Sequence, residues 1–542
     1  MTEAQKRGLL EEKVETRREQ TTRPVQWEPP IELSATEQVI VKRIRRAKLF
    51  VFLREHRHEV FDAAFQEELA GLYQDSPRGQ PPVAPALLAL ATILQAYTGA
   101  SDDEVIEASQ LDRRWQLVLD CLDTEEAPFG KGTLVAFRQR LIEANMDRRL
   151  IERTIEVARQ AGAFGAGPLR AALDSSPLWG AGRVEDTYNL LGHALRKALG
   201  VIAVQQGWEL AELATEAKAP VVSGSSLKAA LDRNWDDPTA RQEALAVVLA
   251  ALTAVESWLE TQPESKADPA VQANLQTAQQ IKAQDVEVTK TGTATLRKGV
   301  AKERRISIED AQMRHGRKSR SVRVDGYKRH VVHDLDSGLV RAVGITPANA
   351  PEASVTEAIK TDLAAQQAQL AELHIDRAYL SSTLVRERSA DLVIYCKAWP
   401  VRNGTRFLKT AFELDWERQR IRCPNQQEMP FEPGGTVHFP TEVCAACPLR
   451  ERCTSSPHGR SVSIHPDEAL LGELRKLQLT AAGRAKLRER VAVEHTLAHL
   501  GYWQGRRARY RGDRKNLFDL RRCAVVHNLH VLARLEAFSH AA

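Results

Sequence analysis

The sequence lacks the apolar segments that direct a protein to or across a membrane. Its first twenty residues carry charges throughout and contain no apolar signal-peptide core. The longest uncharged run lies between Arg78 and Asp102, and its apolar part, residues 83–97, is shorter than a helix that spans a bilayer. We therefore expect a cytoplasmic protein with no membrane partner.

Cysteine is scarce, with seven in 542 residues. The odd number, and the placement of four within residues 423–453, argue against a disulfide framework and for metal binding in a reducing compartment. The chain also lacks a GxxxxGK(S/T) phosphate-binding loop, which argues against an ATP-driven motor. Its net charge of +5 is too small to identify a nucleic-acid-binding protein by itself.

With 43% apolar and 27% charged residues, the chain has the composition of a globular protein of several domains. In the all-helical part, one helix is predicted over 37–56, and Ser101 is predicted to cap another, with Glu104 three residues later. The predicted parts are a flexible N-terminal arm (1–33), a helical domain (34–160), a helical insertion (186–296), a cysteine module (421–466) and an α/β domain made of 166–185, 297–420 and 480–535.

Two short apolar strands are predicted, and each ends in an aspartate. The first is expected to end at Asp174, because the Ser-Ser-Pro that follows cannot continue a helix or a central strand. The second ends at Asp376. A hairpin over 322–346 and a helix lie between them, after the insertion. This order of strands and helices predicts a mixed α/β layer.

Three carboxylates are candidate metal ligands. In an open α/β sheet, ligands bind outside the carboxyl ends of the strands, so Asp174 and Asp376 could together hold Mg²⁺, which prefers oxygen ligands. An aspartate at a strand end is also a common turn former or helix cap. Glu494 lies one helical turn after Arg490, a spacing that suits a surface ion pair as well as a metal-binding carboxylate.

The cysteine module contains a CxxC pair flanked by two further cysteines. The CxxC spacing lets two thiolates reach one tetrahedral Zn²⁺, and the outer pair can complete its four ligands. Four cysteines leave no open position, so such a zinc ion would be structural. The alternative is four free thiols, with His438 and His458 as spare ligands. The predicted zinc ligands are Cys423, Cys444, Cys447 and Cys453.

Basic residues concentrate in 484–534, which contains 13 Lys and Arg against 4 Asp and Glu. Tyrosine and tryptophan are interleaved with them, a mixture suited to phosphates and bases, although a charged run is most often a solvated face. A tyrosine recombinase would need a dispersed set of Arg and His that we do not find. We predict nucleic-acid binding through Arg490, Arg506, Arg507, Arg509, Arg511, Arg514 and Lys515, joined by Arg317, Lys318 and Lys328 from a second basic cluster.

Several motifs together resemble bacterial insertion-sequence transposases of the DDE type, in particular members with a late cysteine cluster. The motifs that carry the resemblance are YTGASDDE (97–104), TLVAFRQRL (133–141), DGYKRHVVHD (325–334), CAACPLRERCT (444–454) and RVAVE (490–494). The helical insertion and the cysteine module are departures from a compact version of that family.

The resemblance implies an RNase H-like mixed sheet with a helical N-terminal domain and a zinc-ribbon-like cysteine module. It also implies that Asp174, Asp376 and Glu494 are the catalytic carboxylates and hold two Mg²⁺ or Mn²⁺ ions. The implied partner is double-stranded DNA, as transposon ends and target, bound by a homodimer in the bacterial cytoplasm at the nucleoid.

The implied activity is binding of the terminal inverted repeats, strand cleavage and strand transfer. Two alternatives remain open. One is an inactive, zinc-containing DNA-binding protein derived from a transposase, against which the intact acidic triad argues. The other is a metal-dependent nuclease that cuts DNA without joining it.

Overall fold

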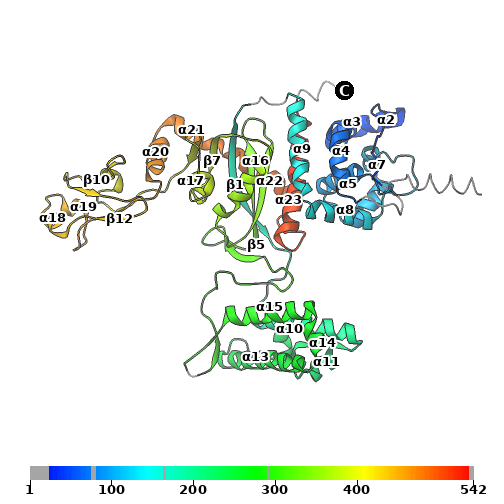
Figure 1. Cartoon of the computed structure of the whole chain (residues 1–542), viewed down its shortest axis with the longest axis horizontal. Coiled ribbons are helices and arrows are strands. Elements are labelled where there is room, and N and C mark those ends of the chain that lie inside the picture. The colour runs from blue at the N-terminus through cyan, green and yellow to red at the C-terminus, as the bar shows by residue number, and fades with distance from the viewer. Residues whose placement is uncertain (1–22, 75–80, 163–166, 291, 536–542) are drawn as a thin grey trace, which may run out of the picture.

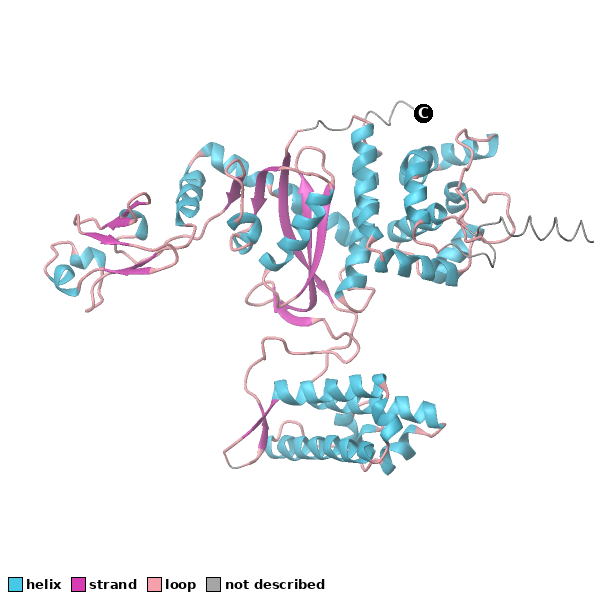
Figure 2. Ribbon diagram, viewed as in Figure 1, coloured by secondary structure: helices cyan, strands magenta, loops and turns pink. Residues whose placement is uncertain are grey.

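The computed structural model describes residues 23–74, 81–162, 167–290 and 292–535. A mixed sheet occupies the centre, with N-terminal helices on one side, a small β-rich module on the other and a helical bundle below (Figures 1 and 2). Residues 1–22 of the predicted arm lie outside the described residues. Residues 23–33 lie along the N-terminal helices, where the Gln66 amide hydrogen-bonds the backbone N–H and C=O of Trp27.

The N-terminal helices pack around one apolar core. The predicted cap is confirmed, because Ser101 and Glu104 form a capping box at the start of α6. These helices are α2 (Ala35–Arg43), α3 (Lys48–Val60), α4 (Ala63–Ala70), α5 (Pro85–Thr98), α6 (Asp102–Leu111), α7 (Arg113–Leu119), α8 (Lys131–Glu143) and α9 (Met146–Gln160).

The single helix predicted over 37–56 is wrong, since α2 and α3 are separated by residues 44–47. Ile40 and Ile44 are both buried, so the chain turns where Ile44 enters the core. Arg45 and Arg46 are exposed in the turn. No proline or glycine marks the break, and apolar periodicity alone therefore runs through it.

The central sheet has the strand order β6-β5-β1-β7-β8, with β4 also paired to β5. Strand β5 pairs antiparallel with β1 on one edge and with β6 on the other, whereas β7 pairs parallel with β1 and β8 pairs parallel with β7. The strands are β1 (Leu169–Trp179), β4 (Arg314–Arg317), β5 (Arg323–Asp334), β6 (Val340–Pro347), β7 (Leu370–Ile375) and β8 (Val393–Cys396). The mixed α/β layer predicted from the order of elements is confirmed.

Strand β1 does not end at Asp174 as predicted but continues to Trp179, paired with β5 throughout. Its other edge pairs with β7 over 169–173. Beyond Leu173, β7 no longer pairs with β1, so that edge of β1 is free at Pro177. Pro177 has no N–H to donate and is tolerated there because no neighbouring strand needs that hydrogen bond. Asp174 is therefore a residue within a strand, located where the neighbouring strand ends.

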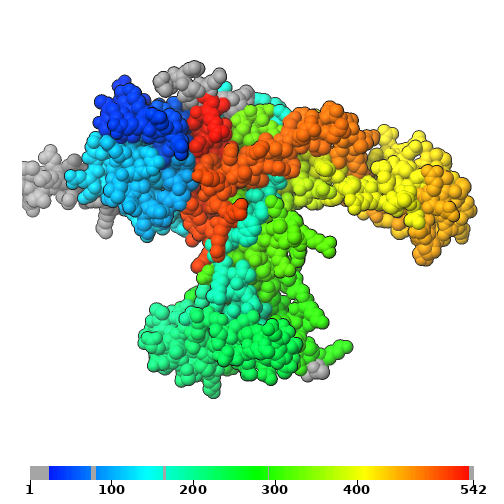
Figure 3. All heavy atoms as spheres, turned by 180° about the vertical axis from the view of Figure 1, so that it is seen from behind, coloured from blue at the N-terminus to red at the C-terminus, as the bar shows by residue number. Residues whose placement is uncertain are grey.

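Helices cover both faces of the sheet. Ala172 faces a core shared with the N-terminal helices and with α22 and α23, whereas Ala171 and Leu173 face a second core. The second core is formed with α16 (Thr356–Ala365), α17 (Thr383–Arg386) and α20 (Glu468–Leu479). The remaining C-terminal helices are α21 (Ala481–Glu489), α22 (Val491–Gln504) and α23 (Asp513–Leu532), which cross the molecule from the cysteine module to the N-terminal helices (Figure 3).

The bundle below the sheet has a core of its own. Its helix α13 is, among the described residues, long and apolar enough to span a membrane by length and composition. One face of α13 packs into the bundle core, as in an amphipathic helix of a globular layer. The bundle contains α10 (Thr187–Gln206), α11 (Leu210–Glu216), η1 (Pro220–Val222), α12 (Leu227–Leu231), α13 (Pro238–Glu260), α14 (Pro263–Ala267), α15 (Pro269–Asp285), β2 (Val286–Val288) and β3 (Ala294–Leu296).

The β-rich module carries the cysteines and has a small apolar core. It contains η4 (Lys409–Ala411), β9 (Glu413–Asp415), β10 (Arg420–Arg422), β11 (Glu428–Pro430), β12 (Thr436–His438), α18 (Thr441–Ala445), α19 (Arg450–Cys453) and β13 (Ser461–Ser463). The short helices η2 (Glu352–Val355) and η3 (Arg377–Tyr379) follow β6 and β7.

Candidate active site

The three predicted carboxylates come from three elements that meet near the middle of the sheet. Asp174 lies on β1 opposite Val331 of β5. Asp376 follows β7 directly and caps η3, where its side chain accepts a hydrogen bond from the backbone N–H of Arg377 at 2.6 Å. Glu494 lies in the first turn of α22, a helix that packs against β1 and β5.

Arg490 joins two of these carboxylates. Its guanidinium forms an ion pair with Asp174 and donates a second hydrogen bond to Glu494 Oε1 at 2.7 Å. The two acids belong to a strand and a helix more than 300 residues apart in the chain. Arg490 therefore links the start of α22 to the Asp174 carboxylate of β1.

Asp376 and Glu494 both act electrostatically on Asp174, although the oxygens of the three acids do not all lie within 4.8 Å of one another. Burial raises the pKa of Asp174, the Arg490 guanidinium and the Ser175 N–H oppose this shift, and the charges of Asp376 and Glu494 add to it. The Asp174 side chain is 14% exposed, whereas those of Asp376 and Glu494 are 50% and 51% exposed. The cluster is thus buried on one side and open to solvent on the other.

This shift predicts how the metal-free protein responds to pH. Because the folded-state pKa of Asp174 lies above that of the unfolded chain, its contribution to stability is present at low pH and is lost as pH rises through the folded pKa. In EDTA at pH 7, Asp174→Asn should therefore raise the melting temperature, by about 1 °C for each 1 kcal/mol gained in a chain of this length. Calorimetry from pH 7 to about 4 should show the gain shrinking; an unchanged or lower melting temperature at pH 7 contradicts this reasoning.

A fourth carboxylate, Glu352 in η2, lies beside the cluster and was not identified from the sequence. Burial raises its pKa, Lys328 opposes that shift from 3.8 Å, and the charges of Asp174 and Asp376 add to it. The nearby Ser175 side chain lowers the pKa of Glu352. No strand end or helix periodicity marks Glu352, so only the fold reveals its position.

A buried polar chain lies beside Ser175. Burial raises the pKa of Tyr379 and the nearby Ser175 side chain opposes this shift. The Tyr379 phenol oxygen lies 2.7 Å from His330 Nδ1, Nε2 of His330 is 2.9 Å from the hydroxyl of Thr346, and burial lowers the pKa of this histidine to about 3. A neutral imidazole with partners on both nitrogens holds the Tyr379 phenol in one position.

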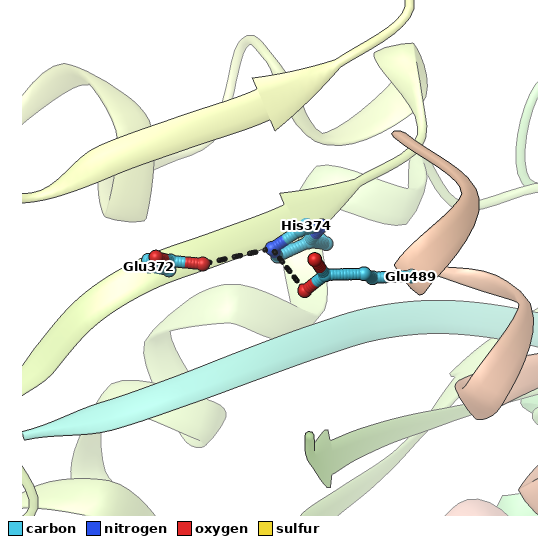
Figure 4. Close-up of side chains that lie close together, drawn as sticks. All are labelled: Glu372, His374 and Glu489. Atoms are coloured by element: carbon cyan, nitrogen blue, oxygen red, sulfur yellow. Dashed lines mark hydrogen bonds and ion pairs between the residues drawn. The ribbon is translucent and has the colours of Figure 1, made fainter. Parts of the chain in front are cut away.

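A second charged cluster lies on segments that directly precede two of the acids in the chain (Figure 4). Glu372 and His374 of β7 meet Glu489 of α21, and their ligand atoms lie within 4.8 Å of one another. Arg170 of β1 binds Glu372 at 3.0 Å and Glu489 at 2.5 Å, and Lys486 binds the same two carboxylates at 3.0 and 3.4 Å. Arg170 also binds Asp336 at 2.6 Å, so the cluster ties together β1, β7 and α21, the helix that precedes Glu494.

Several predicted DNA-binding residues make contacts within the protein. Arg514 pairs with the buried Asp147 at 2.6 Å, and Arg507 donates to the carbonyls of Gly180 and Ala181. Further pairings are those of Arg511 with Glu309 at 2.9 Å, of Lys328 with the Ala350 carbonyl at 2.8 Å, and of Arg317 with the Arg320 carbonyl at 2.9 Å. The side chains of Lys318, Arg506, Arg509 and Lys515 are exposed.

One small cavity of about 30 Å³ is lined by all four cysteines of the module, Cys423, Cys444, Cys447 and Cys453, although no three of their sulfur atoms lie within 4.8 Å of one another. Burial raises the pKa of the Cys453 thiol, and the other three cysteines add to that shift. The backbone N–H of Cys447 bonds the Cys444 carbonyl at 3.4 Å, as expected for a tight CxxC turn.

Comparison with known families identifies two regions of the chain. Residues 41–140 match a family described as "Transposase domain (DUF772)", and residues 422–533 match the family "Transposase DDE domain". No curated protein and no solved structure matches the chain. The second match contains Glu494, Arg490 and the four module cysteines. Together the two matched regions indicate an insertion-sequence transposase of the DDE type.

Proposed function

We propose that this transposase binds the terminal inverted repeats of its insertion sequence and catalyses strand cleavage followed by strand transfer. The observation that carries the proposal is the convergence of Asp174, Asp376 and Glu494, from two strands and a helix, into one electrostatic cluster open to solvent. The strand order β6-β5-β1-β7-β8, with three antiparallel strands followed by two parallel ones, supports an RNase H-like sheet.

The cluster fits divalent cations by the chemistry of its donors. Its ligand atoms are carboxylate oxygens, which Mg²⁺ and Mn²⁺ prefer. Asp174 and Glu494 share the Arg490 guanidinium, and Asp376 lies 4.0 Å from that of Arg377, so three acids face two arginines around the partly buried Asp174. When bound, two such ions would lower the pKa of an attacking hydroxyl and stabilise charge on the phosphate.

The residues of the chain supply the geometry of the reaction. In cleavage, a water oxygen attacks the phosphorus and the bond to the 3′ oxygen breaks, which leaves a 3′-hydroxyl on the transposon end and a phosphate on the other side of the nick. In transfer, that hydroxyl attacks a target phosphorus, the target P–O3′ bond breaks, and the target 3′ oxygen leaves as a hydroxyl. Arg490 keeps Asp174 and Glu494 in position, and the Arg377 N–H fixes the Asp376 carboxylate. The half-exposed Asp376 and Glu494 leave the site open to a duplex. Pairing two ends requires at least a dimer on DNA, which we propose for the bacterial cytoplasm.

The same proposal includes a structural zinc ion in the cysteine module. The thiols of Cys423, Cys444, Cys447 and Cys453 line one cavity, and four sulfur donors are the usual ligand set of a structural zinc. The module has only a small apolar core, so a metal cross-link would add the stability that such a core cannot supply.

The assay for the proposed function uses the full chain and a labelled duplex that ends in the repeat flanking its gene. Mg²⁺ should produce a nick at the repeat end and, with added target DNA, a joined product, whereas EDTA should abolish both. Nicking without joining favours the nuclease. Tight duplex binding without either product favours the inactive DNA-binding protein, and absence of duplex binding contradicts the proposal.

Glu352 is expected to strengthen divalent-metal binding by the neighbouring acids. Replacing it with glutamine removes a charge that acts on Asp174 and Asp376 and frees Lys328 from its partner. The Mg²⁺ concentration that gives half-maximal cleavage should rise about 10–100-fold, the usual cost of losing a group that supports metal ligands. Glu357→Gln, an exposed carboxylate on the neighbouring helix, is the matched control; equal Mg²⁺ dependence in the two variants contradicts this role.

A further inference from the structure

A dense group of cations lies on the N-terminal helices, away from the basic C-terminal segment. It surrounds the turn between α2 and α3 and the start of α7, and all of its members are exposed. In the part of the chain that the structure describes, none of them forms an ion pair or side-chain hydrogen bond. This α2–α3 basic patch consists of Lys42, Arg43, Arg45, Arg46, Lys48 and Arg113.

The patch differs from the other arginines of the same helices. Arg54 pairs with the buried Glu37, and Arg138 pairs with Asp102 at 2.6 Å, so both stabilise the fold. Among the described residues, the patch cations have no such partners; only Lys42 and Arg43 are favourably placed, in the last turn of α2, and the mutual repulsion of the group raises the free energy of the folded protein. Cations kept together without partners indicate an anionic ligand.

The surface at the patch is hollow. A concavity of about 370 Å³ is lined by side chains from α2, the turn and α7, and among the described residues that line it there is no carboxylate. The lining residues are Ile40, Arg43, Ile44, Arg45, Arg46, Ala47, Arg113 and Arg114. Arg114 is held by Asp112 at 2.5 Å, which leaves three exposed arginines from the turn region and one from α7 facing this space.

A helix N-terminus opens into the same hollow. Ala47, which lines it, is the residue before α3, and α3 has no side-chain cap and no acidic residue in its first turn. Its neighbours α2 and α7 are capped by Ser34 and Asp112. An uncapped N-terminus carries partial positive charge and free N–H donors, which suit a phosphate.

We propose that the α2–α3 basic patch binds the phosphate backbone of double-stranded DNA, as a contact separate from the acidic cluster. This inference rests on the proposed function, which supplies DNA as the partner. Guanidinium groups and a helix N-terminus are the donors that proteins use for DNA phosphates. The patch belongs to the region that matches a transposase domain. Backbone contacts here would position the duplex and contribute salt-dependent affinity without selecting a sequence.

The test is fluorescence anisotropy of the full chain with a labelled 30-bp duplex of arbitrary sequence, in EDTA, from 50 to 200 mM KCl. Each phosphate contact contributes about 0.9 to the slope of log affinity against log salt, so Arg45→Gln with Arg46→Gln should lower that slope by about 2 and weaken binding about tenfold at 50 mM. A second double variant, Arg43→Gln with Arg113→Gln, should lower the slope and the affinity to a similar extent, although these residues lie on α2 and α7. The control is Lys197→Gln with Lys282→Gln, which removes the same charge from exposed positions of the helical bundle.

The outcomes separate this inference from the function on which it rests. Wild-type slope and affinity in both patch variants overturn the patch while leaving the proposed function intact. A wild-type chain that does not bind the duplex overturns both. If light scattering shows that the patch variants change oligomeric state while duplex binding is unaltered, the partner is a second copy and the DNA contact is rejected. Equal weakening in the control means that net charge alone is responsible and also rejects it.

Discussion

Replacing Glu494 with glutamine is expected to reduce Mg²⁺-dependent cleavage at least about 10³-fold, the upper range for removing one electrostatic group from an active site. Glutamine keeps the size of the side chain and an oxygen that can accept the hydrogen bond from Arg490. It removes the negative charge that acts on Asp174 and that a divalent cation would bind. The loss should therefore appear in the rate of the chemical step, measured with saturating duplex.

The control for this prediction is Glu357→Gln, which removes one exposed carboxylate from α16 and should leave the rate within twofold. Duplex binding by the Glu494 variant should be no weaker than that of the wild type, because removing one acid reduces the repulsion between the cluster and the phosphates. If Glu494→Gln cleaves at the wild-type rate, the assignment of the third carboxylate is wrong. If it loses duplex binding as well, Glu494 supports the fold instead.

The parts of the fold that follow local rules were predictable from the sequence. The hairpin of β5 and β6 and the strand before Asp376 show the alternation or the apolar run of a buried strand, and the structure has them where expected. Ser101 and Glu104 form the predicted capping box because its geometry depends on four consecutive residues. A structure that depends on residues of one element can therefore be predicted from the sequence of that element alone.

The errors arose where a neighbouring element decides the outcome. Proline at 177 suggested the end of a strand, but the edge it faces is free because β7 stops beside Leu173. Glu352 had no signal, since an irregular segment carries it to the acids. The basic segment near the C-terminus predicts one surface that binds nucleic acid, yet Arg507 and Arg514 bind groups of the protein itself. Charge counts cannot distinguish a cation that stabilises the fold from one that awaits a ligand.

Removal of the proposed zinc is expected to have the other large effect, and it should be confined to the cysteine module. The free energy of binding a structural Zn²⁺ is about 10–16 kcal/mol and is coupled to folding of the site. The module has a small apolar core, so loss of the metal should unfold it while the central sheet, which has separate cores, stays folded. Cys444→Ser should lower bound zinc, measured by mass spectrometry of the purified protein, from one ion per chain to none.

Limited proteolysis can localise this effect, because unfolding of the module should expose cleavage sites within 413–463 and leave the helices on either side protected. His458→Asn is the matched control: the imidazole is exposed in the same module, and its loss should change neither zinc content nor protection. If the His458→Asn variant loses its zinc, His458 is a zinc ligand in place of one of the four cysteines. If the wild-type chain holds no zinc and its module resists protease equally in the presence of a chelator, the four thiols are free and the apolar core alone maintains the module.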